Sequence, residues 1–172
     1  MSLLFETTRL RCRRWLRSDF EALYAVYSDP LAMRWVGEGK PITHEGCAKW
    51  MEVTETNYST RGYGMLALED KANGEVIGFC GLVHPGGQAD VEIKYSFLRS
   101  HWGKGLASEV VPALLAYGAA HHALNRVLAT VDTDNLASQR ILAKSGARLL
   151  ERRLEDDGSV TLVFEWVAPS AA

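Results

Sequence analysis

The sequence has little that would direct it to secretion, a membrane or a metal. Its 172 residues include only three cysteines, Cys12, Cys47 and Cys80, an odd number that is spaced too widely for paired zinc ligands. Long apolar runs are absent, and Met1 to Arg14 lacks the basic and then apolar order of a signal peptide. We therefore expect a cytoplasmic protein with buried thiols, no membrane segment and no metal site.

An excess of charge of either sign is also absent. Nineteen Lys and Arg residues against 21 Asp and Glu residues give a net charge of −2 and a pI of about 6.2. No overall positive field therefore attracts nucleic acid or acidic lipid. A local strip of Arg9, Arg11, Arg13, Arg14 and Arg17 can meet RNA or an acidic acceptor, but the solvated face of an edge strand is the simpler interpretation.

What is present predicts one α/β domain over residues 1–172. Hydrophobic residues make up 47% of the chain and charged residues 23%, as in a soluble globular protein. We find no linker, repeat or low-complexity stretch, apart from a tail over 168–172 that we expect to fray. One core is therefore expected.

The spacing of apolar residues and the positions of turn and cap residues divide the chain into elements. Strands are expected at Thr8 to Arg14 (an edge strand), Tyr63 to Glu69, Glu75 to Val83, Gln88 to Leu98, 126–133, and in a hairpin from Ala147 to Val167 that turns at Asp157-Gly158. Helices are expected from a capping box at Ser18 and Glu21 to Asp29-Pro30, from Thr43 to Arg61-Gly62, over 103–121 and over 135–145. This order predicts a mixed, mostly antiparallel seven-stranded sheet with about four helices and one parallel crossover.

The most informative stretch is a glycine-rich turn before the third helix. It reads Trp102-Gly103-Lys104-Gly105-Leu106-Ala107. The first N–H groups of a helix lack internal partners, so glycines there let a phosphate approach the backbone, and Lys104 adds positive charge. Alone, the pattern is equally typical of a tight turn, and it matches neither a P-loop nor a dinucleotide fingerprint.

A second polar pair opens the next helix. Asn135 and Ser138 are three residues apart and directly follow a strand, so both can reach a ligand held against that strand. The alternative is that Asp134 or Asn135 only caps the helix, which by itself is the more common arrangement.

Taken together, these motifs resemble the GNAT (GCN5-related N-acetyltransferase) superfamily, and within it the RimJ/RimL-like ribosomal-protein alanine N-acetyltransferases. The resemblance covers nearly the whole chain. It rests on Thr7-Thr8-Arg9-Leu10-x-x-Arg13, Asp19, Val76-Ile77-Gly78, Glu92-Ile93-x-Tyr95, Trp102 to Glu109, and Asn135-x-x-Ser138 leading to Lys144-Ser145-Gly146.

The resemblance implies acetyl-coenzyme A as co-substrate. The loop Trp102, Gly103, Lys104, Gly105, Leu106 and Ala107 would then bind its pyrophosphate, and the strand end at Phe97, Leu98 and Arg99 would pair with its pantetheine arm. Asn135 would contact the coenzyme and Ser138 would lie near the thioester sulfur. Many members have a tyrosine on the last helix that acts as the general acid for the leaving thiolate. This chain has Leu142 at that position, so Ser138 or water would have to supply the proton.

Glu92 is the candidate base, because it lies on a polar strand face and an amine attacks a thioester only when neutral. The alternative for Glu92 is an ion pair with Lys94 or another lysine. An acyl-enzyme on Cys80 is disfavoured, since that residue lies in an apolar run without an adjacent histidine.

The resemblance thus implies an N-acetyltransferase that acts on a primary amine by direct attack, and it favours a protein N-terminal α-amine as the acceptor. A small amine such as an antibiotic or polyamine is the nearest alternative acceptor. A non-catalytic acyl-coenzyme A sensor is an alternative of another class. No nucleic acid or membrane partner is expected, and the sequence leaves a homodimer open.

Overall fold

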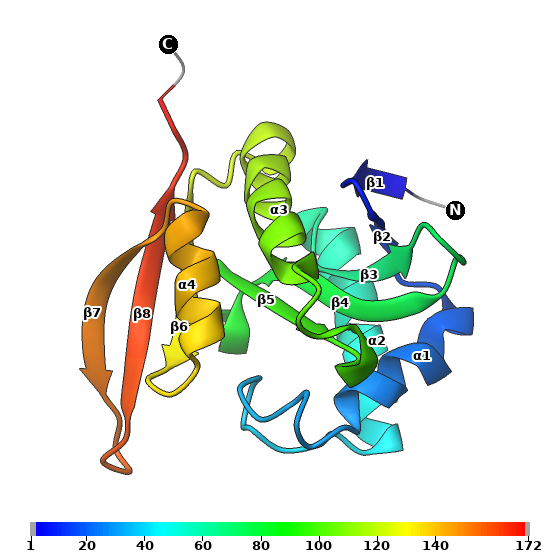
Figure 1. Ribbon diagram of the computed structural model, residues 1–172, viewed down its shortest axis with the longest axis horizontal. Helices are drawn as coiled ribbons and strands as arrows, with labels where there is room; N and C mark the ends of the chain where they lie inside the picture. The colour runs from blue at the N-terminus through cyan, green and yellow to red at the C-terminus, as the bar shows by residue number, and fades with distance from the viewer. Residues whose placement is uncertain (1–2, 171–172) are drawn as a thin grey trace.

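The computed structural model describes residues 3–170 and consists of one large sheet with helices on both faces (Figure 1). The strands are β1 (Leu3–Glu6), β2 (Leu10–Arg14), β3 (Met65–Asp70), β4 (Val76–Val83), β5 (Glu92–Phe97), β6 (Arg126–Asp132), β7 (Arg148–Leu154) and β8 (Val160–Val167). The α-helices are α1 (Phe20–Tyr27), α2 (His44–Arg61), α3 (Leu106–His122) and α4 (Leu136–Lys144). Short 3-10 turns lie at Arg17–Asp19, Pro85–Gly87 and Arg99–His101.

The strands lie in the order β1-β2-β3-β4-β5-β6-β8-β7, and every neighbouring pair is antiparallel except β5 and β6. The mixed sheet with one parallel crossover is therefore confirmed. The predicted strand count of seven is wrong by one, because β1 pairs with β2 from Leu3↔Arg13 to Glu6↔Arg11. The first strand of the sequence interpretation is for the same reason not an edge strand.

The arginines of β2 are correspondingly not a solvated strip. The Arg13 side chain is buried and donates to Asp19 through Nη1 (2.7 Å) and Nη2 (2.9 Å), and through Nε to Glu69 (2.9 Å). Arg11 Nη1 also donates to Glu69, at 3.2 Å. The same Asp19 carboxylate accepts the Leu16 N–H (2.7 Å) before α1, so Asp19, and not the predicted box at Ser18 and Glu21, holds this helix start.

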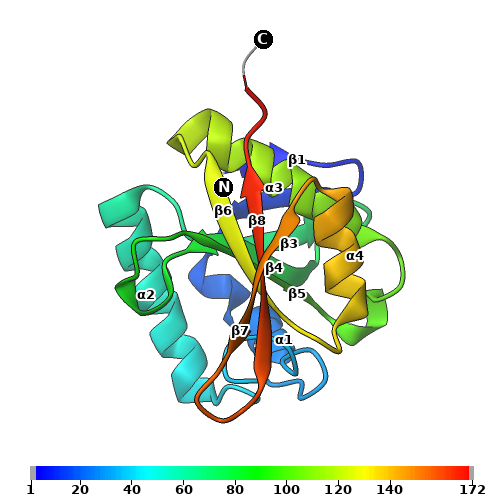
Figure 2. The same cartoon turned by 90° about the vertical axis from the view of Figure 1, so that its left-hand side faces the viewer.

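The two faces of the sheet are covered by different helices. One core packs α3 and Leu142 of α4 against the sheet, and a second packs Leu23 and Val26 of α1 and Cys47 of α2 around Phe79. Figure 2 shows α2 and α4 on opposite sides of the sheet. The described part of the chain contains no helix long and apolar enough to cross a membrane.

The local signals that end helices and turn strands are mostly where the sequence places them. Thr43 Oγ1 accepts the Gly46 N–H (3.0 Å) to cap α2, and Gly62 ends that helix with φ +83°. The three cysteines are buried and unpaired, and burial raises the pKa of Cys47 to about 11. Of the predicted tail, Ala168 still donates its N–H to the Asn125 carbonyl (2.8 Å), and residues 171–172 lie outside the described residues.

Candidate active site

The site begins where the two parallel strands separate. β5 and β6 pair only at Glu92↔Leu128, where the Leu128 N–H donates to the Val91 carbonyl (2.9 Å). In a parallel ladder alternate residues direct their backbone groups to the same neighbour, so the backbone edge at Tyr95 and Phe97 faces the gap left by β6. The Phe97 carbonyl accepts the indole N–H of Trp102 (2.9 Å). The Tyr95 edge has no strand partner on that side.

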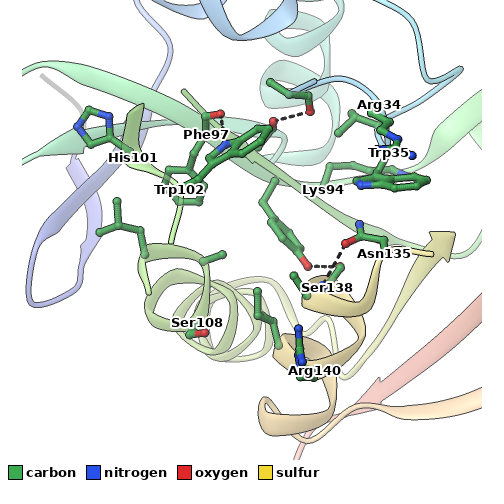
Figure 3. Close-up of a pocket in the computed structure, with 18 of the residues that line it drawn as sticks. Arg34, Trp35, Lys94, Phe97, His101, Trp102, Ser108, Asn135, Ser138 and Arg140 are labelled. Carbon is green, nitrogen blue, oxygen red and sulfur yellow. Dashed lines mark hydrogen bonds between the residues drawn. The ribbon is translucent and has the colours of Figure 1, made fainter. Parts of the chain in front are cut away.

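A cleft of ≈ 610 Å³ fills this gap, within the size range of small-molecule sites (Figure 3). Its walls come from the segment 31–36 after α1, from β5 and Thr130 of β6, from the loop that leads into α3 and the first turn of α3, and from one side of α4 along its whole length. Segments far apart in the sequence therefore meet at the separation of β5 and β6.

The predicted phosphate loop forms one end of this cleft. Gly103 and Gly105 both have positive φ (73° and 77°), which L side chains rarely adopt, and α3 begins directly afterwards at Leu106. A Cβ at Gly103 would meet no atom within 4 Å, so the backbone is open to an approaching anion. Trp102, Gly103, Gly105, Leu106 and Ala107 line the cleft, whereas Lys104 does not.

The N-terminal segment holds this loop in place. Arg9 donates through Nη1 to the Lys104 carbonyl (2.8 Å) and through Nε to the Glu109 carboxylate (2.8 Å) in the first turn of α3. The Arg9 N–H and the Thr7 hydroxyl donate to the other oxygen of Glu109. The opening Thr7-Thr8-Arg9 motif, whose role the sequence did not reveal, is thus a support for the glycine loop.

Asn135 and Ser138 do lie together on the cleft wall. Asn135 Oδ1 accepts the Ser138 N–H (3.2 Å), so the helix-cap interpretation describes the Asn135 side chain (Figure 3). The Ser138 hydroxyl is hydrogen bonded to the hydroxyl of Tyr95 from β5. Burial raises the pKa of Tyr95, and the bond to Ser138 offsets only part of this rise.

The sequence did not single out this tyrosine as a site residue. The resemblance places a hydroxyl on the last helix, where Leu142 is instead buried in the core. Tyr95 instead reaches the same cleft from the central strand. Its place in the Glu92-Ile93-x-Tyr95 motif was the available signal.

Glu92 is not brought to the cleft wall. It lies at the one point where β5 is still paired with β6, and its side chain is buried. Its carboxylate accepts hydrogen bonds from Lys94 Nζ (3.1 Å), Gln88 Nε2 (2.7 Å) and Thr130 Oγ1 (3.1 Å). Burial raises the pKa of Glu92, but the charge of Lys94 and these hydrogen bonds lower it more, so the pKa lies below the ordinary value of a glutamate. The ion-pair alternative describes Glu92, while Lys94 faces the cleft.

The end of β5 that was expected to line the cleft, Phe97 to Arg99, does so only in part. Phe97 lines the cleft, but Leu98 and Arg99 do not. Leu98 donates its N–H to the Ile77 carbonyl on the opposite side (2.8 Å), and Arg99 pairs with Asp29. The open backbone edge therefore comes about two residues earlier than the prediction, because β5 ends at Phe97.

Comparison with known proteins agrees with this geometry. The family model for the acetyltransferase (GNAT) domain matches residues 9–148. An uncharacterized N-acetyltransferase of Bacillus subtilis, YoaA, is 32% identical over 145 residues, which are 83% of this chain and 81% of that protein. The chain belongs to the GNAT acetyltransferase family and is an N-acetyltransferase.

Solved structures share the fold at low sequence identity. RimL, a ribosomal α-N-protein acetyltransferase solved in complex with coenzyme A, superposes with a TM-score of 0.81 at 18% identity, covering 97% of this chain and 98% of that one. A spermidine N-acetyltransferase from Vibrio cholerae, solved with coenzyme A and spermine, gives 0.79 at 16% identity, with coverages of 93% and 96%. Both neighbours hold coenzyme A, while the acceptors in their names differ.

The residues of the cleft fit a coenzyme of this kind. The glycine loop offers backbone N–H groups at the start of α3 without a Cβ in the way, and the Tyr95 edge of β5 offers amide partners for an extended arm. Among residues 3–170, no carboxylate lines the cleft, and no cluster of three metal-ligating side chains is found. The site therefore suits a polyanionic ligand.

Proposed function

We propose that this N-acetyltransferase transfers the acetyl group of acetyl-coenzyme A to a protein N-terminal α-amine by direct attack. The observation that carries the proposal is the absence of a general base on the cleft wall. No Asp or Glu lines the cleft within the described residues, and Lys94 is held in its ion pair with Glu92. An acceptor must therefore arrive with its amine already neutral.

His101 does not change this argument, although it lines the cleft. It lies at the loop end with Trp102, away from Ser138 and Asn135 (Figure 3). Its Nδ1 is bonded to the Ser100 hydroxyl (2.9 Å) and its Nε2 faces Asp70 (3.9 Å). The imidazole of His101 thus contacts Ser100 and Asp70 and lies at the end of the cleft away from Ser138.

This requirement selects among acceptors by their pKa. At pH 8 an α-amine, with a pKa of about 7.7 to 8.0, is at least half neutral, whereas about 0.4% of a lysine-type amine with a pKa near 10.4 is neutral. Among residues 3–170, a polyamine would also find no carboxylate on the lining to hold its remaining cations. Both points favour an α-amine over a lysine side chain or a polyamine.

The roles of the residues follow from their positions. The glycine loop, Phe97 and the Tyr95 backbone would hold the coenzyme, which supplies an activated thioester when bound. Direct transfer releases one proton at the acceptor nitrogen and requires one at the leaving sulfur. We propose that Ser138 Oγ, which is hydrogen bonded to the Tyr95 hydroxyl, passes a proton to the leaving sulfur. Glu92 acts as a positioning residue that holds Lys94.

A substitution at Ser138 tests this assignment. We expect Ser138→Ala to lower kcat about 100-fold, the low end of proton-transfer catalysis, with little change in the KM for acetyl-coenzyme A. Glu92→Gln should leave the shape of the pH–rate profile unchanged. Ser59→Ala, on an exposed position of α2, is the matched control. A kcat of Ser138→Ala equal to that of the control would remove Ser138 from the mechanism.

The acceptor is tested with release of free coenzyme A as the readout. Three acceptors are compared from pH 6 to 10. They are a peptide with a free N-terminus, the same peptide with a formylated N-terminus and an internal lysine, and spermidine. We expect turnover with the free peptide to level off near pH 8, as the α-amine becomes neutral. Faster acetylation of spermidine would overturn the proposal in favour of a small-amine enzyme. Coenzyme binding without turnover of any amine would favour the sensor alternative.

A further inference from the structure

The lining of the cleft is strongly one-sided in charge. Arg34, Lys94, Arg140 and Lys144 line it, together with His101, and no Asp or Glu does so among the described residues. The chain as a whole has a net charge of −2, so the cleft differs in sign from the rest of the molecule. A concave site lined by one sign of charge attracts ligands of the other sign.

Part of this positive charge lies on the coenzyme side. Arg140 and Lys144 are on α4, and Figure 3 shows Arg140 on this helix near Ser138, at the wall opposite Trp35. The phosphates of the coenzyme are the anions that these two side chains would meet. They therefore carry no information about the acceptor.

Arg34 is on the other side of the cleft. It lies next to Trp35 and across from Asn135 and Ser138, at the end away from the glycine loop (Figure 3). Lys94 is close to this end but is compensated by Glu92 at 3.1 Å. No described carboxylate lies within 4.0 Å of the Arg34 guanidinium, although Glu38 follows in the same loop.

The Arg34 side chain is also held in place. Its Cζ lies 4.4 Å above the centre of the Trp35 ring, a cation–π contact that restricts the guanidinium. The segment beneath it is fixed by the buried Met33 and by a hydrogen bond from the Ser96 hydroxyl of β5 to the Ala32 carbonyl (3.1 Å). An exposed, uncompensated and ordered guanidinium suits two-point binding of a carboxylate.

We infer that the acceptor carries a carboxylate close to its amine, and specifically that it is a polypeptide N-terminus with an acidic side chain among its first few residues. This inference rests on the proposed function and adds the charge of the acceptor to it. The amine would enter beside Ser138 while Arg34 holds the carboxylate. An acceptor with extra positive charge would meet Arg34 without a compensating group.

The test is a set of matched peptides acetylated by the wild-type chain. The peptides differ only in carrying Glu, Gln or Lys at position 2 or 3, and kcat/KM is measured at pH 8 in low salt. We expect Glu peptides to exceed Gln peptides about tenfold, the low end for a charge-assisted contact, and Lys peptides to be slower still. We expect the preference to shrink in 1 M salt, where the Debye length falls to about 3 Å.

Two variants assign the preference to Arg34. Arg34→Gln should remove the difference between Glu and Gln peptides, and Arg34→Glu should reverse it in favour of Lys peptides. Arg152→Gln, on the exposed strand β7, is the matched control and should keep the wild-type preference. A free dicarboxylic amino acid forms a further arm, and its faster acetylation would assign the carboxylate to a small molecule and overturn the peptide assignment.

The possible failures are distinguishable. If Glu, Gln and Lys peptides react equally, or if Arg34→Glu leaves the preference unchanged, the inference about charge is wrong while N-terminal acetylation stands. If no peptide is acetylated at any pH, the proposed function itself fails.

Discussion

The support of the glycine loop by Arg9 gives a prediction that isolates coenzyme binding from chemistry. Arg9→Gln removes the guanidinium contacts to the Lys104 carbonyl and to the Glu109 carboxylate, both at 2.8 Å, and leaves the Arg9 backbone bond to Glu109 at 2.6 Å. The β2 strand can therefore still form. The loop, whose two glycines restrict it little, loses its anchor to the sheet.

The size of the effect follows from exposure. A hydrogen bond to a charged group contributes about 1.5 to 3 kcal/mol when buried, but exposed ion pairs contribute about 0.2 to 1 kcal/mol. The Arg9 side chain is 47% exposed and that of Glu109 is 16% exposed, so we take a value near 1 kcal/mol. This corresponds to an increase of about fivefold in the Kd for coenzyme A. We expect kcat to change by less than about twofold, because no reacting group is altered.

The assay is calorimetric titration of coenzyme A into the wild type, Arg9→Gln and the surface control Arg152→Gln, with the free energy of unfolding from urea titration beside it. Burial raises the pKa of Glu109, but its hydrogen bonds to Thr7 and Arg9 lower the pKa by more, so it lies below the ordinary value of a glutamate. A depressed carboxyl pKa means that the contact is complete above the unfolded value and is lost only as the pH falls through the folded one. The effect of Arg9→Gln should therefore be constant from pH 6 to 8.

Three results would refute this reasoning. An unchanged Kd for coenzyme A would show that the loop does not need its anchor. A loss of more than about 3 kcal/mol in unfolding free energy would show that Arg9 has a general structural role, since that exceeds any exposed pair. An effect that varies between pH 6 and 8 would require a titrating group other than Glu109.

Two further predictions concern what fixes the sheet. Arg13→Met leaves the buried Asp19 carboxylate without its cation and Glu69 with Arg11 alone, so the unfolding free energy in urea should fall by roughly 3 to 5 kcal/mol. A loss below about 1 kcal/mol would contradict the buried network. Gly78→Ala would place a Cβ 2.4 Å from the Ser96 carbonyl oxygen and 3.1 Å from Phe97 Cα, both on β5. The substitution Gly78→Ala should cost roughly 1 to 3 kcal/mol of stability and also raise the KM for acetyl-coenzyme A. A stability loss with an unchanged KM would show that β5 does not transmit the strain to the cleft.

The sequence by itself determined the features that depend on near neighbours. The glycine spacing at Gly103 and Gly105 requires positive φ before a helix, and Thr43 and Gly62 bound α2, because caps and turns are decided within a few residues. The alternation of apolar and polar residues predicted the strands β3, β4 and β5, and the order of elements predicted the single parallel crossover. The glycine loop and the Asn135–Ser138 pair, which lie on the cleft, were therefore found in advance.

Only the tertiary structure decided which polar groups reach the cleft. Alternation placed Glu92 and Lys94 on one face of β5, but it could not show that β6 stays paired at Glu92 and departs beyond it. Tyr95 meets Ser138 across a gap of 43 residues, and Arg34 enters from a loop whose position is set by the buried Met33 and the Ser96 bond. Such contacts depend on where strands diverge and loops pack, which are long-range properties, so the glycine loop could be predicted from the sequence while the side chains that face it across the cleft could not.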